Sequence, residues 1–155
     1  MKWMTREGAK VDRIACPWLI SHFVDSKAEF LFVPKENALE TAKRENAIAF
    51  DVPGAELGHY ADADEERVSF DAIIRKYKMT DPALLDLAEI VRTADAKDVS
   101  RPRPEGDGLL AAATGFRLIA KDDHDNMRLQ FPMYDALYAY CKQRVEQGGK
   151  AQSRP

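Results

Sequence analysis

The sequence predicts an α/β domain with a small, mostly parallel three-stranded sheet covered by a helical C-terminal half. Over residues 2–52, short apolar runs alternate with amphipathic ones in the order strand, helix, strand, helix, strand. Beyond residue 69 the apolar spacing is that of helices. A chain of 155 residues, 45% apolar and 32% charged, has the composition of one globular domain. We therefore expect a single domain over residues 1–147 and a flexible tail at 148–155.

The first half of the chain supplies the sheet. We expect strands at residues 2–6, 28–33 and 47–52, and helices at 14–24 and 35–46. Pro17 has no backbone N–H, so it suits the first turn of a helix, and the first helix therefore begins between Asp12 and Cys16. Helical crossovers of this length favour parallel strands joined by right-handed connections.

The second half is predicted to be helical. After an acidic loop at residues 61–67, we expect helices at 70–79, 82–96, 109–121 and 132–146. Ser69 and Asp81-Pro82 are typical starts for the first two of these helices. The segment 100–108 is rich in proline and glycine, which favours a loop.

Arginines gather at one predicted edge of the sheet. Arg6 and Asp51 end the first and third strands, and ligands of open parallel sheets bind outside that edge. The segment from Asp51 to His59 should therefore emerge close to Arg6 and Arg13. Two guanidiniums and the positive end of a helix suit an anion, so we predict anion binding by Arg6, Arg13 and His59.

Arg92 has two possible roles in this scheme. It lies between apolar helical neighbours, in the segment Val91-Arg-Thr-Ala-Asp95. One interpretation is a buried arginine that pairs with Asp95. The other is a third contact to the bound anion.

A metal site is a further hypothesis for the same region. Glu56 and His59 are three residues apart, as in the Glu-x-x-His pairs that bind metals from one helix face. Asp51, Asp123 and His124 would complete a nitrogen and oxygen ligand set suited to zinc, iron or manganese. The alternative is that His59 only bonds a carboxylate at a strand end.

Cys16 is the candidate reactive thiol. Its place near a helix start, with a guanidinium nearby, would lower the pKa of the thiol and suit catalysis. The alternative is a small buried residue beside Trp18. Cys141 lies in the apolar pattern of the last helix and is expected in the core.

Composition restricts the compartment and the partners. The formal net charge of −3 does not favour nucleic-acid binding. Two cysteines far apart do not form a disulfide framework, which fits a reducing cytoplasm. No run of apolar residues is long enough to cross a bilayer, so we expect no membrane association.

Several segments together resemble the chromate resistance family, in its ChrB-type C-terminal domain, from Trp3 to Cys141. They are Thr5-Arg-Glu-Gly, Asp12-Arg-Ile-Ala-Cys-Pro-Trp-Leu-Ile, Glu29-Phe-Leu-Phe-Val-Pro, Phe50-Asp-Val-Pro-Gly-Ala-Glu-Leu-Gly-His, Ser69-Phe-Asp-Ala, Val91-Arg-Thr-Ala-Asp, Asp122-Asp-His and Tyr134-Asp-Ala-Leu-Tyr-Ala-Tyr-Cys. The resemblance implies a role in chromate resistance and chromate-responsive regulation. The chain departs from the family pattern at Ser21-His22, often two basic residues, and at Val68, often a cysteine.

The sequence and the resemblance together lead to one expected function and its alternatives. We expect a cytoplasmic domain that binds or senses a chromate-like or sulfate-like oxyanion and signals to a protein partner, such as a regulator or a sulfurtransferase. We do not expect this domain to bind DNA directly. The first alternative is a metal-dependent or thiol-based enzyme acting on a small anionic substrate. The second is an interaction module whose arginines only form internal ion pairs.

Overall fold

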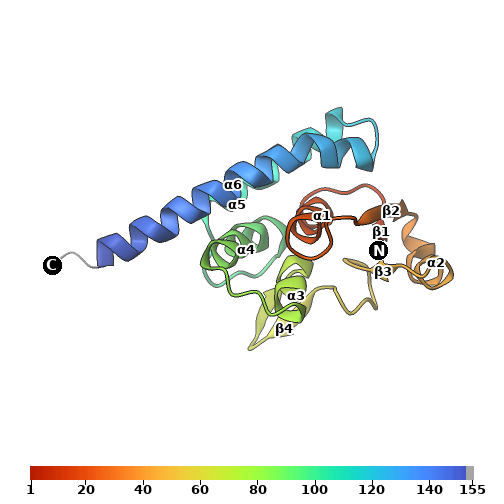
Figure 1. The fold of residues 1–155 in the computed structure, drawn as a ribbon, viewed down its shortest axis with the longest axis horizontal. Coiled ribbons are helices and arrows are strands. Elements are labelled where there is room, and N and C mark those ends of the chain that lie inside the picture. Colours follow the sequence, from red (N-terminus) through yellow and green to blue (C-terminus); the bar gives the residue numbers. More distant parts are fainter. Residues whose placement is uncertain (153–155) are drawn as a thin grey trace.

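The sheet has its first strand in the middle. The computed structural model describes residues 1–152. Strand β1 (Lys2–Arg6) lies between β2 (Glu29–Val33) and β3 (Ile48–Ala49), and both pairings are parallel (Figure 1). The pairing of β1 with β2 runs from Lys2 opposite Glu29 to Arg6 opposite Val33. The predicted fold class is therefore confirmed, with Arg6 at the carboxyl edge.

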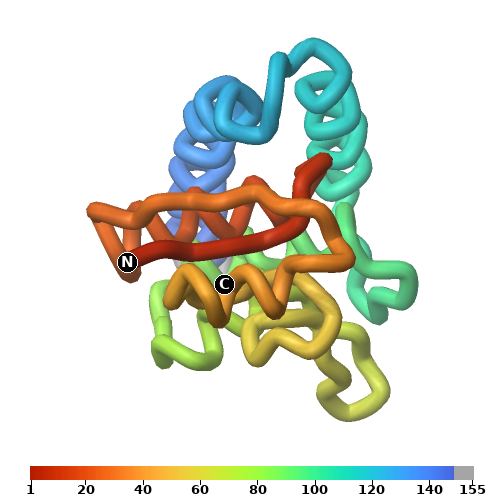
Figure 2. Tube along the Cα trace, turned by 90° about the vertical axis from the view of Figure 1, so that its right-hand side faces the viewer, coloured from red at the N-terminus to blue at the C-terminus, as the bar shows by residue number. Residues whose placement is uncertain are grey.

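Helices cover both sides of this sheet. Helix α1 (Asp12–Phe23) connects β1 to β2, and η1 (Lys35–Asn37) with α2 (Ala38–Glu45) connects β2 to β3. Helix α2 packs beside β1, away from the helical half, whereas α1 lies between the sheet and that half (Figures 1 and 2). Because α1 is enclosed on nearly all sides, its residues from Ile14 to Ile20 are all buried. The helix begins within the predicted interval, but Pro17 lies inside it rather than in its first turn.

Two segments of the first half differ from expectation. Strand β3 is short because Asp51 has a left-handed backbone, with φ of 50°, which turns the chain away after Phe50. The predicted acidic loop is a hairpin of β4 (Tyr60–Asp62) and β5 (Glu65–Arg67). Ala63 and Asp64 both have positive φ, as a two-residue hairpin turn requires.

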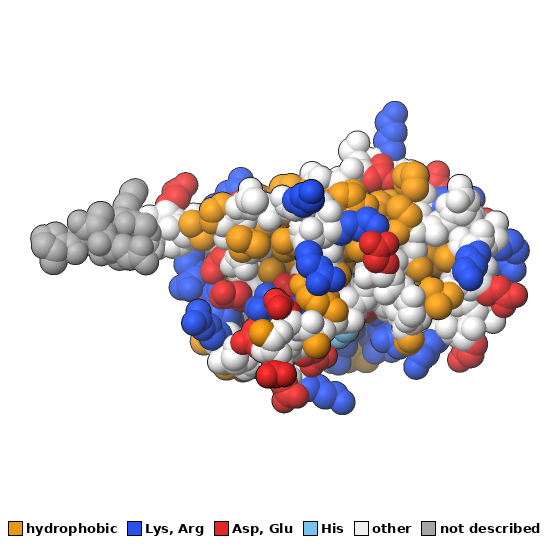
Figure 3. Space-filling view, turned by 90° about the horizontal axis from the view of Figure 1, so that it is seen from below, with side chains coloured by type: hydrophobic (Ala, Val, Ile, Leu, Met, Phe, Trp, Pro, Cys, Tyr) orange, Lys and Arg blue, Asp and Glu red, His pale blue; other side chains and the backbone are white. Residues whose placement is uncertain are grey.

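The helical half contains four helices among the described residues, and two are longer than predicted. They are α3 (Ser69–Lys76), α4 (Pro82–Asp95), α5 (Pro104–Ile119) and α6 (Asp123–Gln152). Helix α6 passes through the glycine at 148, where a tail was expected to begin, and residues 153–155 of that predicted tail lie outside the described residues. Lys and Arg side chains are interspersed with Asp and Glu on the face shown in Figure 3. Over the described part of the chain, none of these helices has the length and hydrophobicity of a membrane span.

Helix α5 includes most of the segment that was predicted to be a loop. Gly106 belongs to the helix because its lack of a side chain lets α5 approach α4 closely at Thr93. The Thr93 hydroxyl is fixed there: it donates to the Glu89 carbonyl at 2.8 Å and accepts from the Arg103 amide at 3.0 Å. The glycine therefore serves helix packing rather than chain reversal.

We expect the substitution Gly106→Ala to destabilise the fold by about 1–3 kcal/mol, because the new methyl would lie 2.5 Å from Thr93 Cγ2. Gly115→Ala in the same helix is the matched control, since nothing lies within 4 Å of its added methyl. This control should stabilise the protein by about 0.5–1 kcal/mol. Urea unfolding of both variants measures the difference, and equal effects would contradict the packing role.

Candidate functional site

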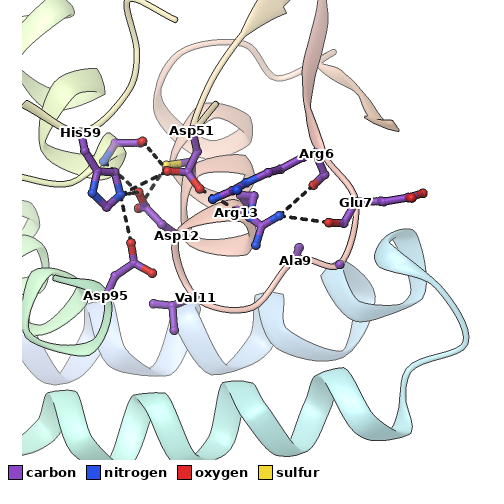
Figure 4. A network of polar contacts seen from close by, with 12 residues as sticks. Arg6, Glu7, Ala9, Val11, Asp12, Arg13, Asp51, His59 and Asp95 are labelled. Atoms are coloured by element: carbon purple, nitrogen blue, oxygen red, sulfur yellow. Dashed lines mark hydrogen bonds and ion pairs between the residues drawn. The ribbon is translucent and has the colours of Figure 1, made fainter. Parts of the chain in front are cut away.

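Four side chains from distant parts of the sequence converge at the carboxyl edge of the sheet. Asp12 begins α1, Asp51 follows β3, His59 precedes β4, and Asp95 ends α4 (Figure 4). One potential ligand atom from each residue lies within 4.8 Å of the other three. We call these four residues the Asp-His cluster. Asp12 and Asp51 are buried, whereas His59 and Asp95 are partly exposed, so the cluster opens toward solvent on one side.

The start of helix α3 holds the two buried carboxylates in place. Asp12 accepts the backbone N–H groups of Ser69 at 2.7 Å and Phe70 at 3.2 Å. A negative charge at a helix N-terminus is favourable because the free amides there point toward it. The Ser69 hydroxyl donates to Asp51 at 2.7 Å. Ser69 was predicted as the cap of this helix, but its side chain serves Asp51 instead.

The imidazole of His59 is surrounded by carboxylates. Its Nε2 lies 3.1 Å from Asp95 and 3.2 Å from Asp51, with Asp12 at 3.7 Å, and its Nδ1 lies 3.2 Å from Glu66. The hydrogen bond to Asp51, followed by that to Asp95, raises the pKa of His59 to about 11. With both ring nitrogens facing carboxylates, the ring offers no free N–H to an anion. This arrangement differs from the direct anion contact expected of His59.

Arg13 lies beside the cluster and supports the backbone. Its guanidinium donates to the carbonyls of Arg6 at 3.2 Å and Glu7 at 3.0 Å, and its Nε lies 3.4 Å from Asp51 (Figure 4). Burial lowers the pKa of Arg13. Its Nη1 and Nε are thus engaged by internal acceptors.

Arg6 is the guanidinium that faces a pocket. Together with Asp51, His59 and the loop at residues 52–58, it lines a pocket of about 230 Å³, which we call the Arg6 pocket. The Nε of Arg6 is buried and has no hydrogen-bond partner among the described residues. A buried donor without a partner costs free energy, and this atom has almost no accessible surface, so it does not itself reach the pocket.

Arg92 belongs to a different pocket. It donates to Asp71 from Nε at 3.0 Å and from Nη2 at 2.7 Å, so it pairs with Asp71 rather than with Asp95. It borders a separate polar cavity of about 290 Å³, which also contains Glu66 and Arg101. The expected grouping of Arg92 with Arg6 and Arg13 around one anion is therefore not what the structure shows.

Three of the five predicted metal ligands are engaged elsewhere. Glu56 is exposed and bonded to Lys76 at 2.9 Å. Asp123 accepts the backbone N–H groups of residues 8 and 9, and the Nε2 of His124 lies 2.8 Å from the Phe30 carbonyl. The structure thus keeps Asp51 and His59 of the predicted set. It adds Asp12 and Asp95, which were not among the predicted ligands, although both stand at ends of predicted helices.

Cys16 is a buried neighbour of the cluster. Its Sγ lies 3.3 Å from Asp12 Oδ1, and the residue has no exposed surface. Burial, together with the nearby charge of Asp12, raises the pKa of this thiol well above its ordinary value. The pKa shift is opposite in direction to the one on which the thiol hypothesis was based.

The donor atoms of the cluster are of types that can bind a metal ion. One imidazole nitrogen and three carboxylate oxygens suit manganese, iron or zinc. To bind such an ion, His59 must lose its proton, so the ion would replace that proton in neutralising the carboxylates.

Comparison with known proteins gives one family and one curated relative. The sequence model described as "ChrB, C-terminal domain" matches residues 3–141. The relative is Protein ChrB of Cupriavidus metallidurans, 30% identical over 142 residues, which are 90% of this chain and 40% of that protein. The chain thus spans less than half the length of this relative. No solved structure matches the chain significantly.

We expect the ring of His59 to remain protonated at about pH 8 in protein stripped of metal, because Asp51 and Asp95 raise its pKa to about 11. The ion pairs of His59 with Asp51 and Asp95 contribute their full stabilisation of the fold below pH 6.5, which is the ordinary pKa of histidine. This stabilisation is lost as the pH rises toward 11. The ¹⁵N chemical shifts of the ring measure its protonation state, and the His59→Gln variant identifies which signals belong to His59. Titration with a midpoint near 6.5 would contradict it.

We expect Cys16 to resist alkylation in the folded protein at about pH 8, because it is buried and its pKa is raised. Mass spectrometry after iodoacetamide treatment, with and without urea, locates the modified cysteines. Modification should require unfolding. Labelling of Cys16 in the native protein at the rate of a free cysteine would restore the thiol hypothesis.

Proposed function

The chain belongs to the ChrB C-terminal domain family, a chromate resistance family, and we propose that it binds one divalent metal ion through the Asp-His cluster. The ion and Arg6 together then hold the oxyanion group of a ligand in the Arg6 pocket. The observation that carries this proposal is the convergence of three carboxylates and one imidazole within 4.8 Å, from four different elements.

Electrostatics supports a cation in this position. Three carboxylates that share a partly buried space repel one another, and burial with the neighbouring charges of Asp51 and Asp95 raises the pKa of Asp12 well above its ordinary value. A single imidazolium offsets one negative charge. A divalent ion offsets two and also satisfies oxygen lone pairs directly, so its binding relieves the repulsion more completely.

The donor types favour the harder metals. Carboxylate oxygens suit manganese and iron, and imidazole is compatible with both and with zinc. The nearby thiol of Cys16 contacts Asp12 and is not part of the converging set. Manganese, iron and zinc are therefore the candidates, with manganese and iron better matched to a set of three carboxylates.

A bound metal ion would also offset the repulsion between an anion and the carboxylates of this site. Without it, the carboxylates of the Asp-His cluster repel an anion from the Arg6 pocket. With it, one ligand oxygen can bind the ion while another accepts from Arg6. Binding of a chromate-like or sulfate-like oxyanion is therefore expected to require the metal.

A second candidate function follows from the same ion. A metal with an open coordination position acts as a Lewis acid, so the domain would be an enzyme for a small anionic substrate.

The Asp-His cluster is also connected to a surface hairpin. Glu66 of the β4–β5 hairpin contacts His59 and accepts the Lys97 amide at 3.1 Å. We propose this hairpin as the contact for a regulator or a sulfurtransferase.

We expect Asp95→Asn to weaken metal binding about 100-fold or more, because it removes a ligand charge. Glu56→Gln is the matched control: it neutralises a carboxylate of the same region that is bonded to Lys76 and lies outside the cluster. Elemental analysis and calorimetric titration with Mn²⁺ should give one ion per chain for the wild type and for this control. No stoichiometric ion in the reconstituted wild type, or wild-type affinity in Asp95→Asn, would refute the metal site.

A further inference from the structure

Glu66 of the β4–β5 hairpin contacts the Asp-His cluster without belonging to the converging ligand set. We infer that Glu66 is a positioning residue of the proposed metal site: it holds the ring of His59 in the tautomer whose Nε2 binds the ion, and it holds the chain that follows Asp95. This inference rests on the metal binding proposed above. It concerns how the ligands of that site are kept in place.

The two ring nitrogens of His59 face different partners. Nε2 lies 3.1–3.7 Å from the three aspartates of the cluster, whereas Nδ1 lies 3.2 Å from Oε1 of Glu66. A neutral imidazole carries a single proton, and a metal ion on Nε2 leaves that proton on Nδ1, where Glu66 accepts it. A carboxylate in this position fixes the orientation of the ring and makes the imidazole a better ligand.

The second oxygen of Glu66 holds the segment that carries another ligand. Oε2 accepts the backbone N–H of Lys97 at 3.1 Å, two residues beyond Asp95. Helix α4 ends at Asp95, so this hydrogen bond holds the chain at the point where the regular helical bonds stop. One carboxylate thus connects the ligand before β4 with the ligand at the end of α4.

Backbone pairing gives Glu66 a defined place relative to the ring. The hairpin strands are antiparallel, and Glu66 lies opposite Ala61, which follows His59 by two residues. Tyr60, the residue directly after His59, lies opposite Arg67. Because the register of the hairpin determines which residues face each other, the contact between the carboxylate and the ring follows from the pairing of β4 with β5.

The test measures Mn²⁺ affinity by calorimetry and the state of the His59 ring by ¹⁵N NMR of protein loaded with Zn²⁺. Glu66→Ala should weaken Mn²⁺ binding about 10–100-fold, as is typical when the partner of a ligating histidine is removed. Glu66→Gln should recover most of this affinity, because its amide oxygen still accepts from Nδ1. In the wild type, the ring should carry its proton on Nδ1 and the metal on Nε2. In Glu66→Ala, the Nδ1 proton should exchange faster with water.

Glu65→Ala is the matched control. Glu65 adjoins Glu66 on the same strand, but it contacts Arg67 at 2.9 Å and the Ser100 hydroxyl rather than His59. The substitution removes the same charge from the same hairpin, so it tests whether the loss of any acid at this place weakens the site. Mn²⁺ affinity in Glu65→Ala should stay within about threefold of the wild type, because salt screens a charge that does not contact the ligands.

The possible failures are distinct. Absence of Mn²⁺ binding by the wild type would refute the metal site, and this inference with it. Normal binding by the wild type with the same affinity in Glu66→Ala would refute the positioning role alone. Equal losses in Glu66→Ala and Glu65→Ala, or Zn²⁺ bound to Nδ1 instead of Nε2, would also refute it.

Discussion

The contact between Asp12 and the first amides of α3 determines the rest of the site. It ties the start of α1 to the start of α3, two points 57 residues apart in sequence. The amides of Ser69 and Phe70 offset part of the cost of burying this carboxylate, although burial still raises the pKa of Asp12. The remaining charge faces His59, and Asp51 and Asp95 join it there. The position of Asp12 thus links the packing of α1 against α3 to the geometry of the Asp-His cluster.

The sequence predicted the sheet and which residues lie at its carboxyl edge, because these depend on local patterns. Strand runs and crossover lengths determine parallel order, and parallel order brings Arg6, Asp51 and His59 to one edge. The other ligands could not be found in this way. Asp95 reaches the cluster only through the packing of α4, which short-range periodicity does not describe.

Two of the differences from expectation have simple physical causes. Glu56 and His59 were paired on the assumption of helical spacing, but residues 51–59 form an irregular loop, so their side chains diverge. Asp123 and His124 are polar residues at the start of a helix, and backbone groups of residues 8, 9 and 30 satisfy them. Such hydrogen bonds to backbone groups far away in the sequence cannot be predicted from local sequence patterns.

The left-handed backbone of Asp51 limits which amino acid this position accepts. At φ of 50°, most side chains are strained, whereas aspartate and asparagine are among the few that adopt this conformation readily. Glycine fits the backbone but carries no ligand oxygen, and asparagine carries no negative charge. Glutamate has the charge but not the conformational tolerance. Aspartate alone meets both demands, so even the exchange of one acid for the other is disfavoured at this position.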